Sequence, residues 1–170
     1  MRFPEIEFNR SYVRWDDYAP SDRFLYTFKK EDWEKVSGEI NSSDDWDRFV
    51  SENKEYFKCF VLRKGDCPNI LAMLYLVNEN LDWTVVSVHG GAVSGCSAVD
   101  MYRGYILMLE ALLDANIKVR TACHVDNTKA IRLNRSLGFV KYQLIGEKIG
   151  FWINKKRLTS SSIYKYLQGH

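Results

Sequence analysis

The feature that most constrains the fold of this chain is a strand, a loop of small residues, a long helix and a second strand in direct succession. Apolar and β-branched residues predict strands over residues 83–88 and 118–125. Between them, apolar residues recur at intervals of three and four, which is the spacing of one helix face. These residues are Ala98, Met101, Tyr102, Tyr105, Leu109, Leu112 and Leu113. The succession predicts a βαβ crossover at the centre of the fold.

The segments around this crossover predict further helices and antiparallel strands. Before it, we expect a strand over 24–28, a helix over 30–36, a helix that opens at Ser43, and a hairpin of 59–62 with 70–77. After it, we expect a helix over 129–137, two strands within 140–154 and a terminal helix over 163–167. This order predicts one α/β (α+β) domain over residues 1–170, with mixed strand pairing.

Charge and cysteine usage exclude several classes of partner. Lys and Arg number 24 against 22 Asp and Glu, so we expect no nucleic-acid partner. The four cysteines form no CxxC pair, and with three separated histidines they predict no metal site. The N-terminus is charged and no run of about 18 apolar residues occurs, which predicts no membrane segment. We therefore expect a soluble, cytoplasmic protein with reduced thiols.

The loop between the first strand of the crossover and its helix reads SVHGGAVSGCSAVD, residues 87–100. Small residues leave backbone N–H groups accessible beside the positive end of a helix dipole, and this arrangement binds phosphate groups. A connection that is merely rich in glycine fits the same residues. At this point both interpretations stay open.

Three nucleotide and hydrolase motifs approach this loop and fail at specific positions. GGAVSGCS at 90–97 has the Walker A spacing, but Cys96 stands where a lysine must contact the phosphates. GCSAV at 95–99 resembles a nucleophile elbow, but Val99 replaces the second glycine. A dinucleotide-binding GxGxxG is absent from the sequence.

Downstream residues give a better match. NTKA at 127–130, Leu133 and LGF at 137–139 resemble the paired motifs of the GNAT superfamily of N-acetyltransferases. The resemblance covers residues 85–142, the acyl-CoA-binding half of that family. In this register, residues 94–99 fall where family members carry a loop of the form R-G-x-G-x-A, whose amides hold the pyrophosphate of coenzyme A. Ser94 replaces the Arg or Gln, Ser97 a glycine and Val99 the small residue.

The resemblance implies a fold, a co-substrate and a reaction. The fold is a mixed, mostly antiparallel sheet flanked by helices. The co-substrate is acetyl-CoA, without a metal, and the acetyl group moves by direct attack of a primary amine on a small molecule, an amino sugar or a peptide N-terminus. The residues expected to bind coenzyme A are Val88, His89, Gly90, Ser94, Gly95, Cys96, Ser97, Ala98, Val99, Asn127 and Asn134.

Two residues are candidates for catalysis. His89 ends the first strand of the crossover, and its reference pKa suits a base near neutrality; a histidine that is only hydrogen-bonded at a strand end is the alternative. Asn134 stands where the family often has an acidic tyrosine. It cannot release a proton, so it either bonds the cofactor near its sulfur or satisfies a buried backbone group. Tyr142 and Cys96 are other candidates for the acid, and we expect His124 at the surface.

Other interpretations remain open on the sequence alone. Cys96 at a helix N-terminus is either a nucleophile that forms an acyl-cysteine or a small residue tolerated in the loop. The whole protein is a transferase, a non-catalytic module that binds acyl-CoA or a protein, or a phosphate-binding hydrolase. The sequence leaves the oligomeric state open, a homodimer included. Aromatic residues that either line an acceptor pocket or pack the core are Trp33, Trp46, Phe151 and Trp152.

Overall fold

The computed structural model describes residues 2–8, 12–22, 43–93 and 95–168. The strand expected over 24–28, the helix expected over 30–36 with Trp33, and Ser94 of the expected cofactor loop lie outside these residues.

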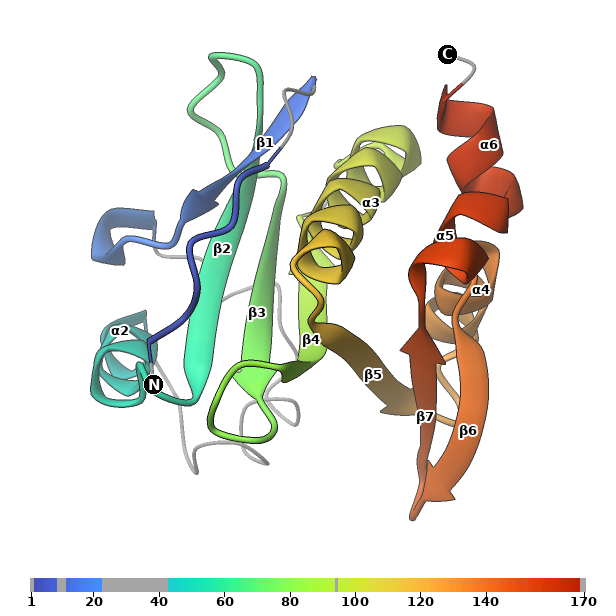
Figure 1. The fold of residues 1–170 in the computed structure, drawn as a ribbon. Helices are drawn as coiled ribbons and strands as arrows, with labels where there is room; N and C mark the ends of the chain where they lie inside the picture. The colour runs from blue at the N-terminus through green and yellow to red at the C-terminus, as the bar shows by residue number, and fades with distance from the viewer. Residues whose placement is uncertain (1, 9–11, 23–42, 94, 169–170) are drawn as a thin grey trace.

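Seven strands form one sheet in the order β1-β2-β3-β4-β5-β7-β6. Neighbouring strands run antiparallel except for β4 and β5, which are parallel (Figure 1). The strands are β1 (Val13–Asp17), β2 (Phe57–Lys64), β3 (Ala72–Asn78), β4 (Val85–Ala92), β5 (Lys118–His124), β6 (Val140–Ile145) and β7 (Lys148–Ile153). The predicted mixed, mostly antiparallel sheet is confirmed.

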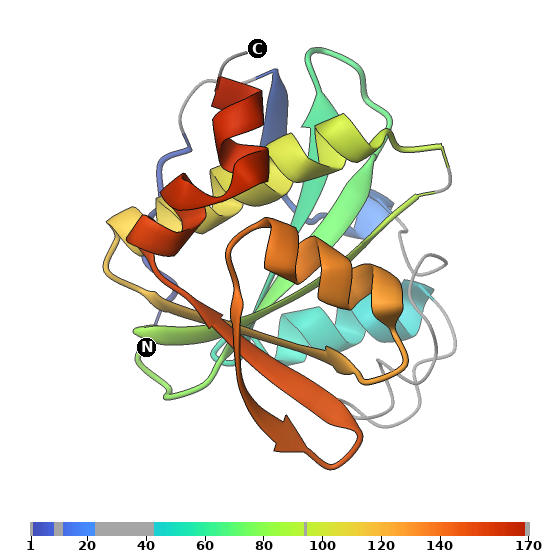
Figure 2. The same ribbon diagram turned by 90° about the vertical axis from the view of Figure 1, so that its right-hand side faces the viewer.

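Helices cover both faces of this sheet. They are the 3-10 turn η1 (Pro20–Asp22) and the α-helices α2 (Ser43–Glu52), α3 (Ala98–Asp114), α4 (Thr128–Ser136), α5 (Lys155–Ser160) and α6 (Ser162–Gln168). Helix α2 packs on one face, and α3 lies on the other face with α4, α5 and α6 (Figures 1 and 2). Helix α3 connects β4 to β5, which confirms the predicted βαβ crossover.

Helix α3 lies close to the sheet because of one glycine. A Cβ atom on Gly104 would come within 2.6 Å of Leu62 Cδ2, so a larger residue there would have to displace the buried Leu62 side chain. The Gly104 carbonyl oxygen also accepts a 2.7 Å hydrogen bond from the indole of Trp15 in β1. Ser97 caps the N-terminus of the helix by accepting a hydrogen bond from the amide of Asp100. Helix α3 is thereby held against β1 and β2, and its N-terminus is capped.

Of the aromatic residues that were candidates for an acceptor pocket, two pack the core. Trp46 is completely buried on the α2 face, where it contacts Phe57 and Tyr75. Phe151 is completely buried on the opposite face. Core packing is therefore the role of both residues, and Trp152 lies under the guanidinium of Arg157.

Three features differ from the sequence-based expectations. Trp83 is not part of β4, since it is a buried turn residue with a φ of 61°, and the strand instead continues to Ala92. Strand β1 was not expected because its outer positions carry charged residues. Helix α5 was not expected because its only buried residue is Leu158. Among the described helices, none has the length and apolar composition needed to cross a membrane.

Candidate functional site

The candidate site begins where β4 and β5 separate. The two strands pair only between Val85–Ser87 and Lys118–Arg120, although β4 continues to Ala92 and β5 to His124. Beyond the paired residues the strands diverge, and β5 runs towards β7 (Figure 1). Divergence of two parallel strands leaves their facing backbone groups without strand partners. The sheet therefore contains a cleft at its centre.

The backbone of Gly90 faces this cleft. The amide of Val93, directly after β4, donates to the Leu71 carbonyl oxygen at 2.9 Å, so odd-numbered residues of β4 turn their backbone groups towards β3. By alternation, the N–H and C=O groups of Val88 and Gly90 point towards β5. Gly90 also has no space for a side chain, because a Cβ atom would lie 2.6 Å from the Met73 carbonyl oxygen. Its amide is thus a backbone donor next to open space.

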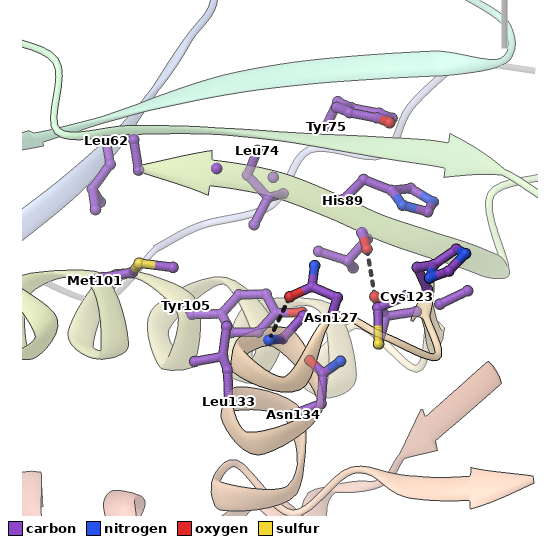
Figure 3. Close-up of a pocket in the computed structure, with 18 of the residues that line it drawn as sticks. Leu62, Leu74, Tyr75, His89, Met101, Tyr105, Cys123, Asn127, Leu133 and Asn134 are labelled. Carbon is purple, nitrogen blue, oxygen red and sulfur yellow. Dashed lines mark hydrogen bonds between the residues drawn. The ribbon is translucent and has the colours of Figure 1, made fainter. Parts of the chain in front are cut away.

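A pocket of about 220 Å³ occupies the cleft. Its lining residues come from β1 to β5, the start of β7, α3, the loop before α4, and α4. Ten of them are labelled in Figure 3. The residues that line it include Tyr75, Val88, His89, Gly90, Tyr105, Thr121, Cys123, Asn127, Asn134 and Lys148.

The structure brings together five of the residues expected at the site. Val88, His89, Gly90, Asn127 and Asn134 all line the pocket, with His89 on the β4 side and the two asparagines on the α4 side (Figure 3). The expected cofactor residues Gly95, Cys96, Ser97, Ala98 and Val99 do not line it. They lie in the turn after β4 and the first residues of α3.

The imidazole of His89 lies on the opposite face of β4 from Val86 and Val88, as strand alternation predicts. Val86 and Val88 are buried in the α3 core, whereas the His89 ring stacks on Tyr75 of the α2 core, with a centroid distance of 5.1 Å. Burial, together with the positive charge of Lys148, lowers the pKa of His89 to about 4. The ring is therefore neutral at physiological pH and can accept a hydrogen bond.

Asn134 projects from α4 and is only 4% exposed. In the described part of the chain its carboxamide makes no hydrogen bond. A buried amide normally finds partners, because an unmade hydrogen bond costs about 1–3 kcal/mol. The carboxamide therefore has donor and acceptor capacity that it can offer to a molecule in the pocket.

Asn127 has a structural role as well. Its side-chain oxygen accepts a 3.1 Å hydrogen bond from the amide of Ala130 and so caps α4, as expected from the sequence. The NH₂ group of the same side chain is not used by this cap. Asn127 therefore holds the start of α4 at the pocket wall.

Tyr105 is a pocket residue that the sequence did not identify. It comes from α3, and its ring stacks with Phe139 at a centroid distance of 6.2 Å. Burial raises the pKa of its phenol, which keeps the hydroxyl protonated. Its helical spacing marked it as a core position, and no local sequence signal separates a core tyrosine from one that ends in a cavity.

Two further residues of the pocket come from the ends of β5 and β7. His124 lines the pocket, but its ring nitrogens contact two acids that do not line it. Nε2 lies 3.1 Å from Glu147, and Nδ1 lies 3.6 Å from Asp126. Lys148 pairs with His124 across the two strands and also lines the pocket. Lys148 was not identified from the sequence, since a lysine after a turn is usually a solvated residue.

The thiol of Cys96 lies at the start of α3. Burial and the carboxylate of Asp100 raise its pKa, while the charge of Lys64 has the opposite, smaller effect. Lys64 is itself paired with Asp100 at 3.2 Å. The lowered pKa that an acyl-cysteine mechanism requires is not found, so the structure favours Cys96 as a small loop residue.

No protein-family model matches the sequence, and no curated protein is significantly similar to it. Solved structures do match the fold. FdhC, a nucleotide-linked sugar GNAT in its apo form, superposes with a TM-score of 0.72 at 12% identity, covering 98% of both chains.

Two other solved GNAT structures are similar in fold. Spermidine N-acetyltransferase from Vibrio cholerae, in complex with CoA and spermine, has a TM-score of 0.62 at 13% identity over 89% of this chain and 100% of that one. The ribosomal-protein-S5-alanine acetyltransferase from Vibrio fischeri has a TM-score of 0.60 at 15% identity, over 91% and 99% of the two chains. At these identities the likeness shows that the chain has the GNAT fold.

Proposed function

We propose that the protein is a cytoplasmic N-acyltransferase that moves an acetyl group from acetyl-CoA to a primary amine. The amine belongs to a small molecule, an amino sugar or a peptide N-terminus. The observation that carries the proposal is the cleft between β4 and β5, whose pocket is lined by Gly90 and Asn134. Gly90 lies beyond the residues that pair β4 with β5, and the Asn134 carboxamide makes no hydrogen bond on the described residues. The GNAT fold of the chain supports it.

The residues around the cleft fit a narrow amide-containing chain such as pantetheine. Val88 to Gly90 offer strand-like backbone groups, to which an amide can bond as another strand would. Asn134 offers a donor and an acceptor on the opposite wall. The amides of residues 95, 97, 98 and 99, at the positive end of α3, would hold the pyrophosphate. Ser94 completes the loop in the sequence and supplies no charge.

The proposed reaction needs little from the protein beyond positioning. Acetyl-CoA supplies an activated thioester. The Gly90 N–H would bond the carbonyl oxygen, where negative charge develops. The amine nitrogen forms a bond to the carbonyl carbon, the C–S bond breaks, and the sulfur takes a proton from solvent. Asn134 would donate a hydrogen bond to that sulfur, which stabilises the departing thiolate without proton transfer.

His89 would act on the amine. Because its ring is neutral above a pH of about 4, it accepts a hydrogen bond from the amine throughout the physiological range. Its low pKa makes it a weak base, so the proton passes on to water once the new C–N bond has formed. His89 orients the nitrogen lone pair towards the carbonyl carbon in this scheme.

A second candidate function is a module that binds acyl-CoA or a protein partner without catalysis. Asn134, at the position where the family often has an acidic tyrosine, favours it. It predicts coenzyme A binding without thiol release.

Calorimetry with coenzyme A and acetyl-CoA tests the proposal directly. We expect saturable binding of both, and release of free thiol from acetyl-CoA when a panel of primary amines is added. Absence of binding at near-millimolar coenzyme A contradicts both the transferase and the acyl-CoA-binding module. Stabilisation by a nucleoside triphosphate with Mg²⁺, and not by coenzyme A, would indicate the phosphate-binding hydrolase instead.

A further inference from the structure

The side chains that line the pocket carry a net positive charge. Of the residues that line it, only Lys148 carries a full charge at neutral pH, and no Asp or Glu is among those the structure describes. The imidazoles of His89 and His124 complete the set of titratable nitrogen groups. The described lining therefore offers a cationic ligand no carboxylate.

Lys148 lies on the same side of the sheet as His89. In β7 its neighbour Ile149 is buried in the core on the α3 face, so alternation turns Lys148 towards the α2 face, where the His89 ring stacks on Tyr75. The two residues are close enough for the lysine charge to lower the pKa of His89. Lys148 therefore lies near the place where the amine would be activated.

The ammonium group of Lys148 has no acidic partner among residues 2–8, 12–22, 43–93 and 95–168. Across the described residues it forms no salt bridge and no hydrogen bond. The carboxylate of the adjacent Glu147 is turned away to His124 Nε2 at 3.1 Å. Some other cations of the described residues are paired with acids: Arg63, for example, contacts Asp16 and Asp22 at 3.0 and 2.7 Å.

We propose that the acceptor amine also carries an anionic group, a carboxylate or a phosphate, and that Lys148 binds this group while His89 contacts the amine. This inference rests on the proposed function. A partly desolvated ammonium gains most from an anion that replaces its lost water, and the gain is larger in a pocket than at an open surface. A polyamine acceptor would meet repulsion from Lys148 and no compensating acid in the described lining of the pocket.

Acetylation of matched amine pairs tests the specificity. Each pair shares one skeleton and differs in charge: glucosamine 6-phosphate and glucosamine for a phosphate, an α-amino acid and its amide for a carboxylate, with spermidine as a polycation. We expect kcat/KM to be at least about tenfold higher for the anionic member of one pair, the size of effect a charged hydrogen bond provides. Equal rates within both pairs, or a preference for spermidine, would overturn the inference.

Lys148→Met identifies the residue responsible. We expect it to raise KM for the preferred anionic amine by about tenfold or more, and to change KM for its neutral counterpart much less. Lys141→Met is the matched control, since Lys141 lies in the same hairpin opposite Phe151, whose side chain is in the core on the α3 face. A similar rise in both variants contradicts a specific role of Lys148.

Two binding measurements keep the inference separate from the proposed function. We expect coenzyme A to bind the wild type and Lys148→Met equally; weaker binding to the variant would assign Lys148 to the cofactor and overturn the inference. With coenzyme A saturating, inorganic phosphate should raise the melting temperature of the wild type more than that of Lys148→Met. An equal phosphate effect in both proteins also overturns it. Failure of coenzyme A to bind at all refutes the proposed function itself.

Discussion

The hydroxyl of Thr121 donates a 2.8 Å hydrogen bond to the carbonyl oxygen of Val88, at the point where β4 and β5 stop pairing. Val88 would otherwise present a buried acceptor to a strand that has turned away. The side chain of one strand therefore replaces a missing backbone donor of the ladder. This contact marks the closed end of the cleft, and Gly90 is the next residue of β4 whose backbone faces the pocket.

We expect Thr121→Val to destabilise the protein by about 1–3 kcal/mol, because the Val88 carbonyl loses its donor while the volume of the side chain is kept. Urea denaturation measures this free energy of unfolding. Thr121→Ser retains the hydroxyl and should lose less. If the valine variant were as stable as the wild type, the hydroxyl would have no role in closing the ladder.

Asn134→Leu separates a ligand-binding role from a structural one. The carboxamide has no partner on the described residues, so its replacement by an apolar group of similar size should change the free energy of unfolding by less than about 1 kcal/mol. We expect the affinity for coenzyme A to fall by about fivefold or more, since the pocket loses a donor and an acceptor. Calorimetry and urea denaturation measure the two effects.

Ser136→Ala is the control for Asn134→Leu, because Ser136 lies in the same helix outside the pocket lining, and its hydroxyl donates to the Arg132 carbonyl oxygen. It should leave coenzyme A binding unchanged. A large loss of stability in Asn134→Leu with unaltered coenzyme A affinity would show that the asparagine has a structural role instead.

The central crossover could be predicted from the sequence because its signals are local. Helix α3 is apolar over much of its surface. Helix α4 has a recognisable residue at each end, the N-cap Asn127 and Gly138. Residues of the cleft on β4 and α4 were accordingly identified. Hairpins and cap residues depend on neighbours in the chain, so a single sequence is enough to place them.

Tyr105 and Lys148 could not be found in this way. Tyr105 looks like any other core residue of its helix, and only the divergence of β4 from β5 leaves a cavity at its hydroxyl end. Lys148 gains its importance from strands that bring it near His89 across about 60 residues of sequence. Tertiary placement decides both cases.

Gly138 and Gly146 form a matched pair for a stability test. Both have positive φ, of 98° and 59°, but a Cβ atom on Gly138 would lie 2.4 Å from the Arg157 carbonyl oxygen, whereas at Gly146 it would meet nothing within 4 Å. We expect Gly146→Ala to cost about 1–2 kcal/mol from backbone strain alone. Gly138→Ala should cost clearly more, because the backbone of α5 must also move. Equal melting temperatures of the two variants would contradict the close approach of α5 to this turn.

Cys96 should be dispensable for turnover. Burial and Asp100 raise the pKa of its thiol, so little thiolate is present at neutral pH. We expect Cys96→Ala to keep its activity within about twofold, and iodoacetamide to modify the exposed Cys67 faster than Cys96. Mass spectrometry of the alkylated peptides measures the order. Rapid alkylation of Cys96 with loss of turnover would revive the acyl-cysteine mechanism.

His89 should make the protein less stable in mild acid. Its pKa is about 4 in the folded chain and about 6.5 in the unfolded chain, so the unfolded state binds more protons between these values. The free energy of unfolding therefore falls as the pH decreases from about 6.5 to 4. In His89→Gln this part of the decline should disappear, while His124→Gln, at the exposed rim, controls for the loss of a histidine. Urea denaturation at a series of pH values measures the slopes, and an NMR titration midpoint of His89 near 6.5 would show that its ring is solvated and not held against Tyr75.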